Sequence, residues 1–270
     1  MTDLGCRVTL GRTGIQVSRL GVGAAYGVST RACLRAFDAG VNYFYWGSTR
    51  TVEMGLALRE IARHSRDQLV VVMQTYARRG LGARWSVERG LRTLGLDQVD
   101  ILLLGWHDDP PRESLVEVAS RLREQGRARF VAISSHVRPR FQAYVASGVF
   151  DVLHVRYNAA HRGAETDVFP CLPPEGGPGI VTYTNTRWGD LLAPKHMPTG
   201  MSPPSATDCY RFALTNPHVH VALCGPKNDQ EMDAALAALK SGPLDEGELA
   251  RMHRIGDHVH GIRSLMTVLS

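Results

Sequence analysis

Three apolar runs in the first half of the chain end in side chains that can carry protons. Tyr45 lies near the end of the first run, Tyr76 ends the second, and His107 follows the third. In a barrel of parallel strands, the carboxyl ends of the strands meet on one face, where catalytic groups collect. We therefore predict that Tyr45, Tyr76 and His107 are catalytic residues, with Tyr45 or His107 as the proton donor.

The chemistry of these side chains leaves alternatives open. Without a lysine or aspartate nearby, the pKa of Tyr45 stays close to the ordinary value of about 10, which makes it a reluctant acid at neutral pH. The large rings of Tyr45, Trp46 and Tyr76 could instead fill the mouth of the barrel as an aromatic plug. Side chains two residues apart on a strand point to the same side, so His107 points inward if Gly105 does. His107 then lies about 6–7 Å beyond Gly105 along the barrel axis, because a strand rises about 3.3 Å per residue. We therefore expect His107 to line the mouth.

Later strand ends carry imidazole, guanidinium and carboxylate groups. His136, Arg156 and Trp46 are predicted to bind substrate. Arg156 and Arg187 are expected to meet an anionic ligand or to pair with Asp108 and Asp109. Metal binding is not expected, because metal-dependent barrel hydrolases usually need His-x-His on the first strand, where this chain has Gly21–Ala24. Other polar residues at strand ends or in the loops beyond them are His154, His161, Arg187, Asp108 and Asp109.

The elements that must position these residues follow a βα rhythm, which predicts a parallel sheet with helices outside it. At this length we predict an α/β fold, one (β/α)8 TIM barrel over residues 1–270, with an N-terminal β-hairpin in Arg7–Arg19. The predicted strands are Leu20–Ala24, Val41–Trp46, Leu69–Tyr76, Val99–Trp106, Arg129–His136, Val152–Asn158, Gly179–Asn185 and Val219–Gly225. The predicted helices are Thr30–Ala39, Val52–His64, Ser86–Leu94, Glu113–Gln125, Arg138–Ser147, Ala206–Thr215 and Asp229–Lys240.

Three connections stand apart from this rhythm. The segment Ala160–Pro170 has a weak helical pattern and is expected to be irregular. Two stretches rich in proline and glycine, Pro170–Gly179 and Pro194–Pro204, are predicted to lie at the C-terminal face as lids or as surface loops.

Composition narrows the class of protein. The chain has 270 residues, 44% hydrophobic and 21% charged, which is typical of an ordinary globular protein. The net charge of +5 comes without a long basic run interleaved with aromatics, so nucleic-acid binding is not expected. No apolar run is long enough for a membrane span. The five cysteines form no Cys-x-x-Cys pair and are expected to be reduced and buried. The residues at the N-terminus lack the charged-then-apolar pattern of a signal peptide, so we expect a cytoplasmic protein.

Several short strings, in order along nearly the whole chain, resemble the aldo-keto reductases. They are Leu10–Gly14, Arg19–Gly23, Ala39–Phe44, Val99–Leu104, Tyr157–Asn158, Ile180–Tyr183 and Phe212–Pro217. The resemblance implies a barrel that binds an extended nicotinamide dinucleotide over its C-terminal face without a Gly-rich loop. In that family hydride passes to a carbonyl while a tyrosine, tuned by a lysine and a histidine and supported by an aspartate, supplies the proton.

The residues at the corresponding positions depart from that pattern. Tyr45 stands for the aspartate, Tyr76 for the lysine and Gly105 for the histidine, while the segment Gly47–Thr51 contains no tyrosine. All four residues of the tetrad are therefore absent by this alignment. The ring of Tyr45 is expected to bring a phenol near the space of the missing tyrosine's hydroxyl.

The cofactor positions implied by the resemblance are mixed. Tyr183 matches the tyrosine on which the nicotinamide stacks, and Ser134 matches the serine of a Ser-Asn pair that holds the carboxamide. Ser135 stands in place of the asparagine of that pair, and His154 in place of a glutamine that also binds the carboxamide. On the adenine side Glu231 replaces an arginine that binds the 2′-phosphate, which disfavours NADP, and Lys227 could offset this.

Three functions remain open from the sequence. The first is an atypical oxidoreductase of this family that uses NAD or, less favourably, NADP with a repurposed proton donor. The second is a non-redox enzyme such as a cyclase, dehydratase or isomerase. The third is a pseudoenzyme that binds a ligand, and neither of the last two requires a nicotinamide cofactor. Each takes a small molecule as its partner, and the oligomeric state is left open.

Overall fold

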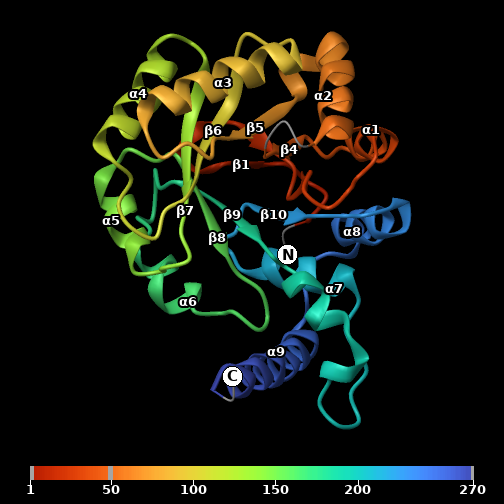
Figure 1. The fold of residues 1–270 in the computed structure, drawn as a ribbon. Coiled ribbons are helices and arrows are strands. Elements are labelled where there is room, and N and C mark those ends of the chain that lie inside the picture. The colour runs from red at the N-terminus through yellow and green to blue at the C-terminus, as the bar shows by residue number, and fades with distance from the viewer. Residues whose placement is uncertain (1–2, 48–50, 269–270) are drawn as a thin grey trace.

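Eight parallel strands close into a barrel in the computed structural model, which describes residues 3–47 and 51–268. The strand order is β10-β3-β4-β5-β6-β7-β8-β9, so neighbours in sequence are neighbours in space until β10 closes the ring on β3. Figure 1 shows the helices outside this ring. The barrel strands are β3 (Leu20–Gly23), β4 (Tyr43–Trp46), β5 (Val70–Gln74), β6 (Val99–Trp106), β7 (Ala128–Ser134), β8 (Val152–Arg156), β9 (Gly179–Tyr183) and β10 (Val221–Cys224).

The predicted barrel and its eight strands are confirmed, with ends that differ by a few residues. The largest consequence is at β5, which ends at Gln74 rather than Tyr76. The helices are α1 (Thr30–Asp38), α2 (Val52–Ser65), α3 (Gly80–Leu94), α4 (Glu113–Glu124), α5 (Arg140–Ser147), α6 (Ala164–Asp167), α7 (Ala206–Thr215), α8 (Asp229–Ser241) and α9 (Glu246–Val268). Short 3-10 turns are η1 (Gly11–Thr13), η2 (Arg66–Gln68), η3 (Phe169–Cys171), η4 (Arg187–Leu192) and η5 (Pro194–His196).

Two helices differ from the prediction. Helix α3 begins at Gly80 rather than at Ser86, which lies inside it. Gly80 is required there because a Cβ would lie 2.4 Å from the carbonyl oxygen of Ser114. Helix α9 was not predicted, and it packs against the barrel through Met252, Ile255 and other buried residues on one face.

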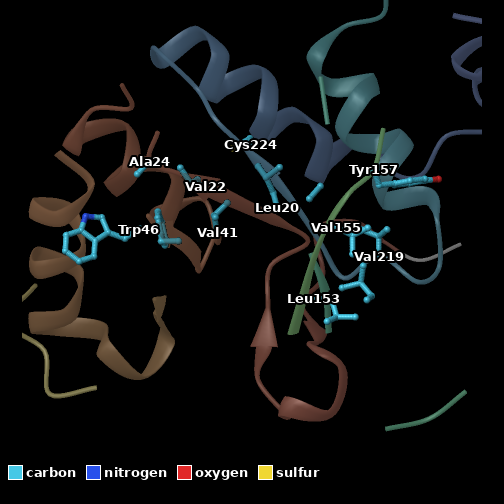
Figure 2. Packing of buried hydrophobic residues seen from close by; sticks show 14 of the residues in the cluster. Leu20, Val22, Ala24, Val41, Trp46, Leu153, Val155, Tyr157, Val219 and Cys224 are labelled. Carbon is cyan, nitrogen blue, oxygen red and sulfur yellow. The ribbon is translucent and has the colours of Figure 1, made fainter. Parts of the chain in front are cut away.

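The strands separate two hydrophobic cores, as alternating side chains require. The outer core lies between strands and helices and contains Val22, Phe44 and Leu153, some of which Figure 2 shows. The inner core fills the barrel and contains Tyr43 and Val72 together with other inward side chains.

The predicted hairpin is present as β1 (Val8–Thr9) and β2 (Gln16–Val17), paired antiparallel. Leu10, Ile15 and Val17 belong to the inner core, so the hairpin closes the amino end of the barrel. A Cβ on Gly179, the first residue of β9, would lie 2.5 Å from Leu10 Cδ1. The hairpin is therefore packed tightly against the strand ends.

Both loop predictions can be compared with this arrangement. The Pro170–Gly179 loop is not at the C-terminal face, because Arg12 donates its backbone N–H to Gly177 at 2.8 Å beside the hairpin. The short α6 and η3 carry the chain back to the amino end before β9 begins, in line with the irregular connection that was expected. The Pro194–Pro204 loop follows β9 and contains η5.

Two further features concern partners and redox state. Within the described residues, no helix is long and apolar enough to cross a membrane. All five cysteines are free thiols, but Cys6 is exposed, so the expectation that every cysteine is buried is wrong.

Candidate functional site

A cavity of about 640 Å³ lies at the carboxyl ends of the strands, within the size range of small-molecule sites. Its wall runs from the ends of β4 to β9 across to the start of α8. Of the predicted site residues, those that line it are Tyr45, Ser134, His136, His154, Tyr183 and Lys227. Tyr76, His107, Trp46 and Arg156 are not among the described residues that line it.

Tyr45 points into the barrel from β4, and its hydroxyl donates a hydrogen bond to Gln74 Oε1. Burial raises the pKa of Tyr45, and the nearby phenol of Tyr76 raises it further. The expectation of an ordinary pKa near 10 is therefore wrong. Tyr45 is firmly protonated at neutral pH and releases its proton with difficulty.

Tyr76 lies at the rim rather than in the cavity, with 56% of its surface exposed. Its hydroxyl and that of Tyr45 both face Gly47, at 3.5 and 3.3 Å from the position of a Cβ there. On β5, Val70, Val72 and Gln74 point inward at alternate positions. The inward side chain at the end of this strand is therefore Gln74 and not Tyr76. Tyr76 thus lies next to Tyr45 without being among the described residues that line the cavity.

His107 is not at the mouth, contrary to the parity argument. The pairing of β6 with β7 shifts register between Leu103 and Trp106, and Gly105 has a φ of 88°. A residue with a side chain is strained at that φ, so the glycine permits the irregularity. Trp106 consequently lines the cavity, while His107 is buried with Nε2 3.1 Å from the carbonyl oxygen of Leu104.

Trp46 also lies away from the cavity. Its ring is 2% exposed and belongs to the outer core, and its Nε1 donates to the carbonyl oxygen of Thr51 at 3.1 Å. Figure 2 shows the ring directed to the helices outside the barrel. Because Tyr45 points inward, strand alternation turns Trp46 outward. Trp46 therefore belongs to the outer core and is not among the described residues that line the cavity.

Ser134, His154 and Tyr183 come from three successive strands, β7, β8 and β9, and meet in the cavity. Complete burial lowers the pKa of His154 to about 3, so its imidazole is neutral. Its Nε2 lies 3.0 Å from the hydroxyl of Tyr43, which can donate to it. Three strand ends thus offer a hydroxyl, an imidazole and an aromatic ring to one ligand.

The Tyr183 hydroxyl is buried without a hydrogen-bond partner among the described residues. Burial raises its pKa, and the nearby Ser134 hydroxyl partly offsets that rise. A buried hydroxyl with no partner costs free energy, so this one calls for a ligand atom or water.

His136 lines the cavity from the loop after β7 and is half exposed. Its ring stacks on Trp106 with 6.0 Å between centroids. Asp108 accepts the backbone N–H of His136 at 2.8 Å and lies 3.9 Å from its Nδ1. His136 is therefore held at the mouth with a carboxylate behind it.

Arg156 ends β8 and lies beside Tyr183 in the register of β8 with β9. By strand alternation it is on the same inward face as His154. Its side chain is half-buried just outside the cavity wall. Arg187, the other candidate for an anionic ligand, is buried and lies 3.7 Å from Asp190.

At the far end of the cavity lie Lys227 and Glu231, next to the start of α8. The side chain of Asn228 caps α8 by accepting the N–H of Glu231 at 2.9 Å. Glu231 Oε2 in turn accepts the backbone N–H of Lys227 at 2.9 Å. This bond holds a carboxylate at the cavity wall.

The loop after β9 forms one side of the cavity and has an unusual backbone. Thr184, Arg187 and Trp188 have φ values of 57°, 51° and 54°. Such left-handed conformations are uncommon for residues with a side chain and cluster at functional sites. Asn185 anchors the loop by donating to the carbonyl oxygen of Leu223 at 2.9 Å.

Several lining residues escaped the sequence analysis. Gln74 shares the alternation of Val70 and Val72, a signal that was available. Tyr26 lies in the loop just after β3 and Tyr210 lies in α7, so the strand alternation used for the other residues does not apply to them. Within the described residues, no group of three or more His, Cys, Asp or Glu side chains comes together in the manner of a metal site.

A closed (β/α)8 barrel with a cavity at the carboxyl ends of its strands belongs to a class that binds small molecules there. The chain is a member of the aldo/keto reductase family, whose sequence profile matches residues 24–207.

Individual relatives are distant in sequence. The chain is 23% identical over 233 residues to the NADH-specific methylglyoxal reductase of Escherichia coli (strain K12), covering 67% of this chain and 70% of the relative. It is 24% identical over 317 aligned positions to L-galactose dehydrogenase of Arabidopsis thaliana, covering 97% of each.

Solved structures agree on the fold. An aldo-keto reductase from Bacillus halodurans in its holo form superposes with a TM-score of 0.79 at 17% identity, covering 93% of this chain and 96% of that one. An aldo/keto reductase from Klebsiella pneumoniae in complex with NADP and acetate gives 0.76 at 21% identity, covering 93% and 95%.

Proposed function

We propose that this protein is a nicotinamide-dependent oxidoreductase that reduces a small carbonyl compound, with Tyr45 as the proton donor. The observation that carries the proposal is one cavity that joins Tyr45 and Tyr183 at the barrel mouth to Glu231 near α8. Family membership supports it, since members of the aldo/keto reductase family share this barrel and this face. We also propose a cytoplasmic location, consistent with five free thiols.

The residues present fit a nicotinamide dinucleotide. When bound, that cofactor supplies hydride to the carbonyl. Tyr183 offers a ring to the nicotinamide and a buried hydroxyl that lacks a partner, and Ser134 offers a second hydroxyl. His154 stays neutral and is held by Tyr43, so it presents no competing charge to the nicotinamide ring.

The role of Tyr45 is to hold a proton at its hydroxyl oxygen and to release it to a developing alkoxide. Its bond to Gln74 Oε1 orients the hydroxyl, and burial together with Tyr76 keeps the proton in place. A donor whose pKa is raised gives up its proton slowly. We therefore expect slow reduction of ordinary aldehydes and ketones.

The nucleotide preference follows from the α8 end of the cavity. Glu231 is held at the wall by the Lys227 N–H, and its carboxylate repels a 2′-phosphate. We propose that NADH is preferred over NADPH. The Escherichia coli relative, an NADH-specific methylglyoxal reductase, supports this preference.

A direct test is to titrate the protein with NADH, NAD+, NADPH and NADP+ while following ligand fluorescence or calorimetric heat. Saturation by NADH, together with slow carbonyl-dependent NADH oxidation that Tyr45→Phe abolishes, supports the proposal. If none of the four nucleotides saturates, the protein is not a nicotinamide enzyme.

A second candidate is a non-redox enzyme or a ligand-binding protein on the same barrel. One observation favours it: burial and neighbouring tyrosines raise the pKa of Tyr45, and no cation among the described residues is found to lower it. Such a site holds a ligand without a ready proton donor. Absence of nucleotide binding with retained binding of a carbonyl compound is the result that favours this candidate.

A further inference from the structure

Arg156 is a half-buried cation at the carboxyl end of β8. Arg156 makes no ion pair or hydrogen bond with any described residue, although it is half-buried. The acidic side chains of the neighbouring segment are already engaged. Asp167 accepts from Arg138 at 2.7 Å, Asp257 accepts from Arg162 at 2.7 Å, and Glu165 accepts from the Tyr157 hydroxyl at 2.6 Å.

Two buried polar atoms without a partner belong to the segments next to Arg156. They are His161 Nδ1, in the loop after β8, and Tyr183 Oη, on the neighbouring strand. Arg156 lies beside Tyr183 in the register of β8 with β9, and His161 follows Arg156 by five residues in the loop that β8 leads into. The charge of Arg156 also lowers the pKa of both side chains.

His161 lies in the loop after β8 with its imidazole neutral. Burial lowers the pKa of His161 to about 4, and the charges of Arg187, Arg156 and Arg138 lower it further. The ring of His260 meets that of His161 edge-on, with 5.6 Å between centroids. Arg138 and Arg187 have carboxylate neighbours in Asp167 and Asp190, whereas Arg156 has none among the described residues. An anion placed beside Arg156 would pair with its guanidinium and accept hydrogen bonds from the unpartnered groups.

We propose that Arg156, with His161 Nδ1 and Tyr183 Oη, forms an oxyanion subsite next to the cavity, and that the natural substrate is a carbonyl compound bearing a carboxylate or phosphate group. The substrate assignment rests on the proposed function, whereas the subsite itself does not. Tyr183 belongs both to the cavity wall and to the proposed subsite, so the anionic end of the substrate lies on the β8 side of the cavity. Its carbonyl end lies toward Tyr45.

The first test is binding of small anions to the whole protein, followed by calorimetry in a buffer without other oxyanions. Inorganic phosphate and acetate are the probes, because they separate phosphate from carboxylate recognition. We expect saturable binding of at least one probe, weakened at least tenfold by Arg156→Gln. The matched control is Arg121→Gln, which removes the same charge from the exposed face of α4.

The second test repeats the titration with saturating NADH. Anion binding that persists supports a substrate subsite, whereas competition between NADH and the anion assigns Arg156 to the cofactor and overturns the proposal. Binding unchanged in Arg156→Gln also overturns it. Thermal melting of both arginine variants, together with NADH affinity, shows whether a loss of binding reflects unfolding.

The third test compares matched substrates. We expect 4-oxobutanoate or glyceraldehyde 3-phosphate to have a kcat/KM at least tenfold above that of butanal or glyceraldehyde, with the advantage lost in Arg156→Gln mainly through KM. Equal values for charged and uncharged substrates contradict the substrate assignment. If the protein turns over no carbonyl compound, the proposed function fails while the anion titrations still decide the subsite.

Discussion

The cavity has two walls that differ in what they offer a ligand. The binding wall, made of Ser134, His154 and Tyr183 on β7 to β9, presents polar atoms and a ring beside cationic Arg156. The donor wall, made of Tyr45, Gln74 and Gly105 on β4 to β6, presents a phenol with a raised pKa and an amide. In a barrel each strand contributes its own end to the site, so one wall can change while the other keeps its shape.

The difference between the two walls is tested most strongly by removing the hydroxyl of Tyr45 from the donor wall. Tyr45→Phe should lower the rate of carbonyl reduction by about 10²–10⁴-fold, the usual contribution of general acid catalysis. NADH affinity should stay within about twofold, because Tyr45 lies on the other wall. Steady-state kinetics and a nucleotide titration measure both quantities.

Tyr76→Phe is the matched control for that substitution, since it removes the hydroxyl of a residue that lies next to Tyr45 but is not among the described residues that line the cavity. Its effect on rate should be much smaller. A rate in Tyr45→Phe equal to that of the native protein removes Tyr45 from the mechanism.

The binding wall should make stability depend on pH. The folded pKa of His154 is about 3, below the ordinary value near 6.5, so its contribution to stability is complete above pH 6.5 and is lost as the pH falls toward 3. Between pH 6.5 and pH 5 the free energy of unfolding should fall by about 2 kcal/mol from this histidine, since each pH unit below the ordinary pKa costs about 1.4 kcal/mol. Half-buried His161 and His220, each with a pKa of about 4, act in the same direction.

His154→Gln isolates the part that belongs to the binding wall, because a glutamine does not titrate. Denaturant unfolding at pH 7 and pH 5 should give a smaller pH-dependent loss in the variant than in the native protein. Identical losses in the two proteins contradict the assignment of a neutral, buried imidazole.

The same wall can be tested by its ring. Tyr183→Ala should weaken NADH binding by about tenfold or more, because stacking of a base on an aromatic side chain contributes about 1–3 kcal/mol. Tyr183→Phe keeps the ring and serves as control, so its NADH affinity should remain near that of the native protein. Equal affinities in the alanine variant and the native protein would falsify the stacking role.

The smallest effect is expected at the far end of the cavity. Glu231→Gln should raise NADPH affinity several-fold and leave NADH affinity nearly unchanged, since one repulsive contact near a surface is worth about 1 kcal/mol. Parallel titrations with both nucleotides measure the ratio. A native preference for NADPH of tenfold or more contradicts the repulsion argument from the outset.

Much of the barrel follows from the sequence because buried parallel strands leave continuous apolar runs. Helix α9 was missed because its buried Met252, Ile255 and Val259 are interspersed with histidines and glycines, which blur the helical pattern. The start of α3 was missed because Gly80 and Gly82 look like a turn, although Gly80 is there for its close contact with Ser114.

The site was predictable only where strand alternation holds. Tyr45 and Tyr183 reach the cavity because their strands are regular up to those residues. His107 does not, because Gly105 adopts a positive φ and shifts the register, which a sequence cannot reveal. Trp46 could have been excluded at once, since it directly follows an inward residue on the same strand. Gln74 was overlooked because the apolar run was extended past it to Tyr76.

The hairpin at the amino end of the barrel bears on the order of events during turnover. Leu10 and Val17 are fully buried in the inner core, so in the described part of the chain the hairpin closes the amino end of the barrel beneath Tyr43 and Val72. Ligands that reach Tyr45 must then enter and leave through the cavity at the carboxyl ends of the strands. If a dinucleotide lies across this cavity from Tyr183 to Glu231, it must bind first and dissociate last. Turnover would then follow an ordered kinetic scheme in which the reduced product leaves before the oxidised nucleotide.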